Sequence, residues 1–132
     1  MMIQTNSAIQ NYSRFNVLAQ PTFPMAMSNQ ELDRLAQLSN QSQWILFTSE
    51  CPRPDYEQFA SHQVRCQQII QMKPSQKKSE MEIVIQAIKC GNASAVVASS
   101  QIEPINQQLL KELAAKHQCE VFFVEGRASK YH

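Results

Sequence analysis

The sequence contains very little glycine: Gly91 and Gly126 are the only two in 132 residues. An α/β protein usually holds a nucleotide phosphate with a glycine-rich turn, which brings backbone N–H groups up to the anion at the start of a helix. Two isolated glycines cannot form either the G-x-G-x-x-G or the G-x-x-x-x-G-K-[ST] pattern. The sequence therefore excludes the usual dinucleotide- and ATP-binding loops.

Long apolar runs and net charge are also scarce. No run approaches about 18 apolar residues, so we expect no membrane-spanning helix. The first residues lack a basic start followed by an apolar block, so we expect no secretory signal and a cytoplasmic protein. The formal net charge is +1 and apolar residues make up 43%. This composition predicts one globular domain, with neither nucleic acid nor membrane as a partner.

Metal-binding and catalytic patterns are missing as well. The four cysteines are Cys51, Cys66, Cys90 and Cys119, with no C-x-x-C pair and no zinc-like clustering with histidine. In a reducing compartment they are expected to be small buried or half-buried thiols. A catalytic cysteine needs a partner base, and the sequence nominates none. We therefore expect no metal, no cofactor and no enzymatic activity.

What the chain does contain is an alternation of helix and strand patterns over residues 28–126, between an N-terminal tail of 1–27 and a C-terminal tail of 127–132. Apolar residues at helical spacing, with two capping boxes, predict helices over about 29–39, 55–62, 79–88 and 104–113. Short apolar runs predict buried strands over 44–48, 66–72, 93–98 and 121–124. The pattern predicts an α/β fold with a small, mainly parallel sheet of four strands flanked by helices.

Polar residues follow three of these strands, at positions 48–50, 72–74 and 98–100. Ligands of open parallel sheets bind beyond the carboxyl ends of the strands. Ser99, Ser100 and Lys73 would then hold a small anion, which makes a phospho-ligand-binding protein or small enzyme one alternative function. Loops after strands are polar in any case, so the pattern is more typical of ordinary solvated loops.

Two surface features have two interpretations each, and a third has one. The basic loop with Lys73, Lys77 and Lys78 is either a solvated loop or a contact for an acidic partner. Trp44 is either rim packing or an interface anchor, because tryptophan is enriched among binding hot spots. Tyr56 and Phe59 share a helical face, and packing of both on the sheet is the first expectation.

One stretch resembles a known family. Gln41-Ser42-Gln43-Trp44 leads into a strand, Ile69-Ile70-Gln71 forms the next, and a helix over 79–88 closes in Gly91-Asn92-x-Ser94-x-Val96-Val97. This order and spacing are similar to the SulA family of bacterial cell-division inhibitors, over roughly residues 29–124. The resemblance implies a trimmed RecA-like core, related to P-loop NTPases but lacking the phosphate loop.

The resemblance also implies a function. Proteins of this type are induced in the SOS response to DNA damage and bind FtsZ on the surface that would meet the next subunit. Polymerisation and GTP hydrolysis both fall, because two FtsZ subunits complete one GTP site. The nearest alternative is a RecA-like accessory protein that binds recombination or translesion-synthesis proteins.

Two further partners follow from the resemblance. Members of this family can be dimers, so a second copy is one. The chain end Tyr131-His132 is similar to the end of some members, which implies an ATP-dependent protease acting on the C-terminal tail. An ordinary frayed end is the other interpretation of these residues.

The resemblance carries over to particular positions. Trp44 and Thr48 correspond directly to the family pattern. Phe59 lies beside the position of a second family tryptophan. Gln68 stands at a position where the family tends to be basic, and Arg65 lies three residues before it. These five residues are the predicted FtsZ-binding set.

Overall fold

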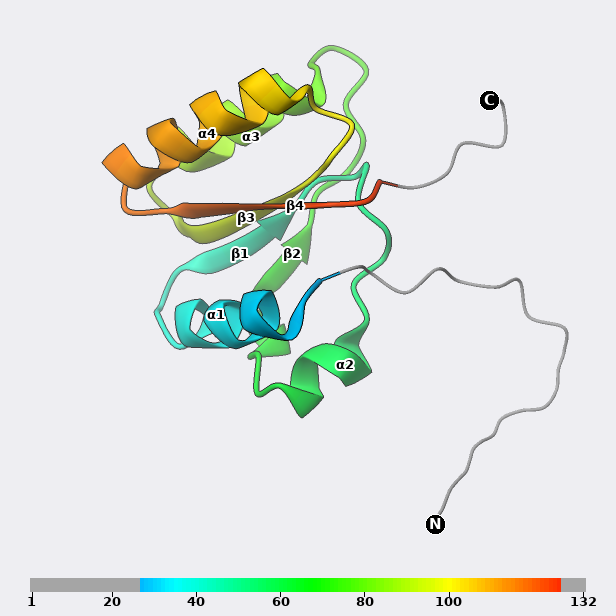
Figure 1. The fold of residues 1–132 in the computed structure, drawn as a ribbon, viewed down its shortest axis with the longest axis vertical. Coiled ribbons are helices and arrows are strands. Elements are labelled where there is room, and N and C mark those ends of the chain that lie inside the picture. Colours follow the sequence, from blue (N-terminus) through cyan, green and yellow to red (C-terminus); the bar gives the residue numbers. More distant parts are fainter. Residues whose placement is uncertain (1–26, 127–132) are drawn as a thin grey trace, which may run out of the picture.

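The computed structural model describes residues 27–126, in which helices and strands alternate along the chain. The elements are α1 (Asn29–Ser39), β1 (Trp44–Phe47), α2 (Tyr56–Ser61), a 3-10 turn η1 (Cys66–Gln68), β2 (Ile69–Gln71), α3 (Glu80–Lys89), β3 (Ala93–Ser99), α4 (Pro104–Lys116) and β4 (Glu120–Val124). The four strands form one parallel sheet in the order β2-β1-β3-β4 (Figure 1). The predicted fold class is confirmed.

Local sequence signals explain where the longer helices begin and end. Ser28 and Glu31 form a reciprocal capping box at α1, with N–H···O distances of 2.9 and 3.1 Å. Ser79 and Glu82 repeat the arrangement at α3. Both boxes satisfy backbone donors that a helix start leaves unpaired. Gly91 follows α3 with φ at 77°, a left-handed conformation that costs glycine little.

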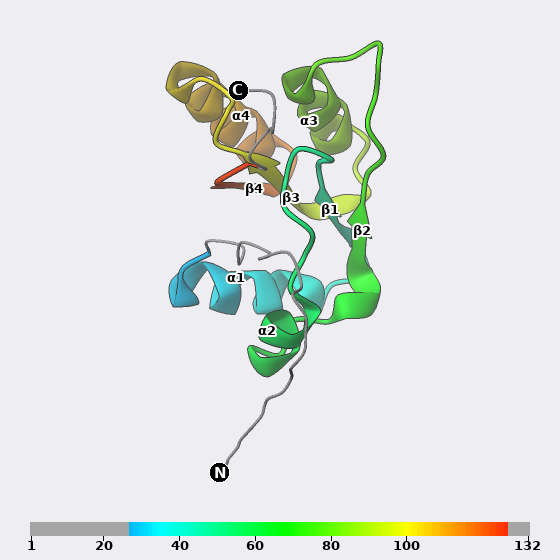
Figure 2. The same cartoon turned by 90° about the vertical axis from the view of Figure 1, so that its right-hand side faces the viewer.

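Helices cover both faces of the sheet, as Figure 2 shows, with α1 and α2 on one face and α3 and α4 on the other. The α1 side buries a cluster that includes Leu35, Phe47 and Phe59. The α3 side buries a second cluster that includes Val84 and Leu110. All seven residues of β3 are buried because this strand lies inside the sheet and is covered on both faces.

Two expectations about α2 and β2 were wrong in detail. The predicted strand over 66–72 is a strand only at Ile69–Gln71, because η1 precedes it and the Gln68 N–H donates to the Arg65 carbonyl at 3.0 Å. Tyr56 was expected to pack beside Phe59, but it is 44% exposed. The six-residue helix α2 makes fewer than two turns, and only Phe59 faces the core.

Within residues 27–126, the strand order places β2 and β4 at the two edges of the sheet and creates one switch point. The crossover from β1 leads to β2 on one side, while β3 and β4 lie on the other side of β1. The carboxyl ends of β1 and β3 therefore mark the place where an open α/β sheet usually binds a ligand. Among residues 27–126, no helix is long and apolar enough to span a membrane.

Candidate functional site

The switch point between β1 and β3 is occupied by the side chain of Glu80, from the first turn of α3. One carboxylate oxygen of Glu80 accepts hydrogen bonds from the Thr48 hydroxyl and the Ser99 N–H, both at 2.7 Å. The other accepts from the Ser99 hydroxyl at 2.6 Å. The chain's own carboxylate thus takes the donors that an anionic ligand would need.

This arrangement removes the main support for a phosphate site at the strand ends. Ser99 and Thr48 are fully buried, and their hydroxyl groups already donate to Glu80. An incoming phosphate would face the Glu80 carboxylate in place of free donors, and like charges repel. Lys73 and Ser100 are exposed, but Ser99, which was expected to act with them, is buried and donates to Glu80.

The buried cysteines are poorly placed to react. Cys51 is fully buried beside Thr48, and burial raises the pKa of its thiol to about 11. Burial likewise raises the pKa of Cys119 to about 11. A thiol with such a pKa is protonated near neutral pH, and the thiolate is the reactive form. Within the described residues, no group of three or more histidine, cysteine or acidic side chains is placed to hold a metal ion.

Several exposed side chains lie at the edge of the sheet beside β2, while other large apolar side chains are exposed on α2 and α4. We call the group beside β2 the β2 edge surface, and it is formed by Trp44, Arg65, Gln68, Ile70 and Lys73. Trp44 is 41% exposed and Ile70 is 40% exposed. Arg65 and Lys73 are exposed, and Gln68 is half-buried. The surface therefore combines two large apolar side chains with two cations.

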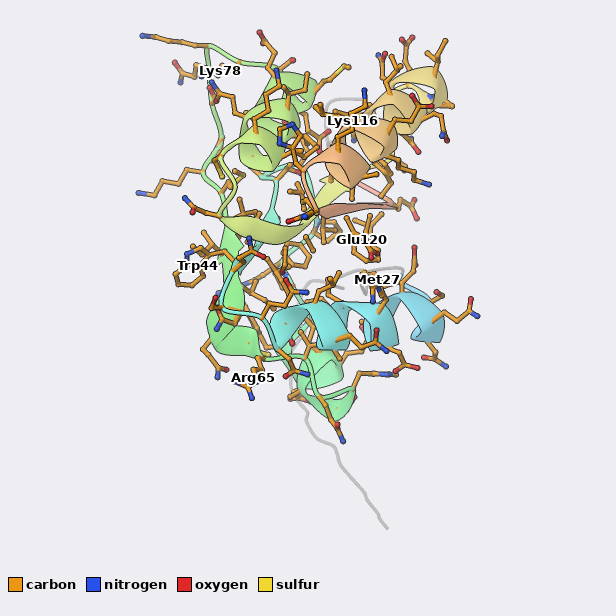
Figure 3. The ribbon with its side chains drawn as sticks, turned by 90° about the vertical axis from the view of Figure 1, so that its left-hand side faces the viewer. Met27, Trp44, Arg65, Lys78, Lys116 and Glu120 are labelled. Atoms are coloured by element: carbon orange, nitrogen blue, oxygen red, sulfur yellow. The ribbon has the colours of Figure 1, made fainter. Side chains whose placement is uncertain are left out.

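Strand pairing brings these side chains together. Leu46 of β1 pairs with Ile70 of β2, and continuing this parallel register places Trp44 level with Gln68. Figure 3 shows Trp44, Arg65 and Lys78 on the β2 side of the molecule, and Met27 and Glu120 on the opposite side. Residues from two separate stretches of sequence, position 44 and positions 65–73, thus form one surface.

The backbone of Trp44 is fixed by the loop that follows α3. Its N–H donates to the Asn92 carbonyl at 2.8 Å, and the Gln43 side-chain amide donates to the Gly91 carbonyl at 3.0 Å. The register between β1 and β3 shifts between Trp44 and Ile45. Irregularities of this kind often re-aim a side chain at the end of a strand. Trp44 is therefore presented by a well-anchored backbone.

Arg65 is anchored through a buried serine at the end of α1. Its N–H donates to the Ser39 hydroxyl at 2.9 Å, and that hydroxyl donates to the Ala36 carbonyl at 2.8 Å. The preceding residue, Val64, is buried, while the Arg65 side chain remains exposed. The loop before β2 is thus tied to the core and leaves its cation free to meet a partner.

The structure divides the five predicted site residues into two groups. Trp44, Arg65 and Gln68 lie on the β2 edge surface. Thr48 and Phe59 have 0% exposure, so neither offers atoms to a partner in this conformation. Thr48 bonds to Glu80, and the Phe59 ring packs on Phe47 with the ring centroids 5.8 Å apart.

Sequence reasoning missed Ile70 as a surface residue. It lies in an apolar pair with Ile69, which packs against the α1-side core. Both isoleucines look buried in the sequence. Only the position of β2 at the edge of the sheet leaves Ile70 exposed.

The protein is a small parallel α/β domain. Its own Glu80 carboxylate closes the switch point, and two of its exposed apolar side chains, Trp44 and Ile70, lie at one sheet edge. The family described as cell division inhibitor SulA matches residues 16–120. The chain therefore belongs to the SulA family of cell division inhibitors.

A solved relative supports the same fold. The crystal structure of SulA from Pseudomonas aeruginosa is similar with a TM-score of 0.51 and 14% sequence identity, covering 71% of this chain and 82% of that one. Comparison with curated protein sequences finds no significant match. The C-terminal Tyr131-His132 and most of the expected N-terminal tail lie outside the described residues.

Proposed function

We propose that this protein inhibits cell division by binding FtsZ through the β2 edge surface, as part of the response to DNA damage. The observation that carries the proposal is the match to the SulA family over residues 16–120, in a chain whose Trp44 is 41% exposed. Exposed apolar side chains that lie together beside cations are candidates for a protein-binding surface. Tryptophan and arginine are also the residue types that contribute most to binding hot spots.

The mechanism needs no chemical step by the inhibitor. A protein that covers the FtsZ face toward the next subunit prevents two subunits from completing one GTP site. Polymerisation and GTP hydrolysis then fall together, in proportion to the FtsZ that is bound. The closed switch point, with Glu80 holding Thr48 and Ser99, fits a domain that acts by surface contact.

The two cations of the β2 edge surface, Arg65 and Lys73, are expected to contribute electrostatically to FtsZ binding. Arg65 and Lys73 are exposed at either end of β2, and within residues 27–126 neither takes part in an ion pair. They would pair with acidic groups on FtsZ and speed association at low salt. Trp44 and Ile70 between them would supply the apolar contact. Association should therefore slow as ionic strength rises.

The test mixes purified protein with FtsZ and GTP, and follows filament pelleting and phosphate release. Ile70→Ser should weaken both forms of inhibition roughly tenfold, because it removes an apolar contact of about 1.4 kcal/mol. Ile105→Ser is the matched control, since Ile105 is 71% exposed on α4, away from the β2 edge. It should inhibit like the unaltered protein.

Two outcomes would contradict the proposal. Unchanged polymer and unchanged hydrolysis at excess inhibitor would remove FtsZ as the partner. Equal loss of inhibition in Ile70→Ser and Ile105→Ser would place the contact elsewhere. Thermal unfolding of both variants, measured beside the assay, shows whether either change acts through folding instead.

A further inference from the structure

The switch point between β1 and β3 presents three hydrogen-bond donors to one carboxylate group. Ser99, the last residue of β3, donates its N–H to one oxygen of Glu80 at 2.7 Å and its hydroxyl to the other at 2.6 Å. The Thr48 hydroxyl donates to the first oxygen at 2.7 Å. Both oxygens of the carboxylate are therefore held, one by two donors and the other by one.

The sheet holds these donors in place through bonds that do not involve Glu80. The Thr48 N–H donates to the Val97 carbonyl at 3.0 Å, which fixes the end of β1 against β3. The Ser99 hydroxyl accepts from the Gln101 N–H at 3.3 Å while it donates to Glu80. Thr48 and Ser99 are both 0% exposed. Removal of the carboxylate would leave buried donors without their charged acceptor, which is costly.

Glu80 reaches these donors from a different element. It is the first residue of α3, 32 positions after Thr48 and 19 positions before Ser99. Its side chain is half-buried, so one side of the carboxylate position is open to solvent. Glu80 is thus a ligand that the chain supplies from the rim of the site, and it ties α3 to the ends of β1 and β3.

The donors also select the chemical class of ligand. All three are neutral, and within residues 27–126 Glu80 takes part in no ion pair. Hydrogen bonds from neutral groups compensate a single partly buried charge, whereas further charge in the same place would lack a partner. Inorganic phosphate is larger than a carboxylate and carries more charge near neutral pH. A planar monocarboxylate fits both the charge and the two-oxygen arrangement.

We infer that the switch point is a carboxylate-binding site that the chain fills with its own Glu80, and that it binds free acetate once this side chain is shortened. Acetate has the atoms that Glu80→Ala removes, one carbon and the carboxylate group. The unaltered chain should not bind acetate here, because the site is filled. The inference concerns the interior of the domain and does not depend on FtsZ binding.

Thermal unfolding of the full chain carrying Glu80→Ala tests the inference. Its melting temperature should be higher in sodium acetate than in sodium chloride of the same ionic strength, and the gain should saturate as acetate is added. A ligand that binds only the folded state raises the ratio of folded to unfolded protein, and a tenfold rise corresponds to about 4–8 °C in a domain of this size.

Glu82→Ala is the matched control. Glu82 also lies in the first turn of α3, where its carboxylate accepts from the Ser79 N–H at 2.9 Å, but its side chain is exposed. Glu80→Gln is a second control, because its amide still fills the site. Both variants should respond to acetate only as much as the unaltered chain does.

Three outcomes would overturn the inference. Acetate and chloride could stabilise Glu80→Ala equally. Acetate could stabilise Glu82→Ala or Glu80→Gln as much as Glu80→Ala, which would place its binding elsewhere. Inorganic phosphate at the same ionic strength could stabilise Glu80→Ala more than acetate does, which would make this a phosphate site.

A second experiment applies where Glu80→Ala does not fold, and it uses substitutions that nearly preserve side-chain size. Thr48→Val should lower the ratio of folded to unfolded protein by about tenfold or more in the unaltered chain, because it removes a hydrogen bond to a charged group. The loss should be clearly smaller in the Glu80→Gln background, where the acceptor is neutral. Equal losses in the two backgrounds would mean that Thr48 does not serve a carboxylate site, and would overturn the inference.

Discussion

The two edges of the sheet expose similar backbone groups but present them in opposite ways. β2 has three residues, and the side chains around it project outward, with Trp44 and Ile70 each about two-fifths exposed. β4 has five residues and lies recessed between α1 and α4, with its first residue held in an ion pair. Projecting apolar side chains can meet the surface of a folded protein, whereas the side chains of α1 and α4 flank the cavity beside β4. The side chains and flanking helices therefore decide what each edge can bind.

The largest expected effect comes from the aromatic pair beneath the β2 edge. Phe59→Ala should lower the free energy of unfolding by about 3–5 kcal/mol, because it removes a fully buried ring that packs on Phe47. Urea denaturation measures the change. Phe59→Leu is the control and should lose clearly less, since it keeps most of the buried volume. If Phe59→Ala kept the free energy of unfolding of the unaltered protein but failed to bind FtsZ, Phe59 would instead be a contact residue.

The next largest effect is expected on FtsZ inhibition, when Trp44 is removed from the β2 edge surface. Trp44→Ala should weaken FtsZ inhibition by about thirtyfold, equivalent to about 2 kcal/mol of binding free energy. Its melting temperature should change little, because the side chain is 41% exposed. Leu109→Ala on α4, at 51% exposure, is the control and should inhibit normally. A loss of the thermal transition in Trp44→Ala would show that this tryptophan is part of the core.

The smallest effect is expected at the β4 edge. Arg34→Ala removes the ion pair with Glu120, whose side chains are 48% and 39% exposed. Pairs this exposed contribute little to the free energy of unfolding, and salt reduces the contribution further. Urea denaturation at two salt concentrations measures the contribution of the ion pair to stability. FtsZ inhibition by Arg34→Ala should equal that of the unaltered protein. A clear loss of inhibition would mean that both edges take part in binding.

The structure also shows why some sequence predictions held and others did not. The capping boxes at Ser28 and Ser79 are local, and the helices begin where those residues predict. Burial of β3 also follows from its run of small apolar residues. The end of the α2 region depends on longer-range contacts, such as the bond from the Arg65 N–H to Ser39, and here the predicted strand was too long.

The candidate site was harder to predict because its members differ mainly in tertiary position. Thr48 and Trp44 lie on the same strand region, yet one is fully buried and the other is 41% exposed. Nothing in a single sequence indicates that Glu80 will reach across to Thr48 and Ser99. Family resemblance indicated the positions, and the fold decided which of them reach the surface.

The sequence by itself determined the order of helices and strands, the parallel sheet and the lack of a glycine-rich phosphate loop. These properties depend on periodicity, capping and composition, which act over a few neighbouring residues. Only the tertiary structure decided that β2 and β4 form the edges, that Glu80 fills the switch point, and that Trp44 and Ile70 share one exposed surface. Strand order and side-chain burial depend on contacts between distant residues, which local sequence patterns do not specify.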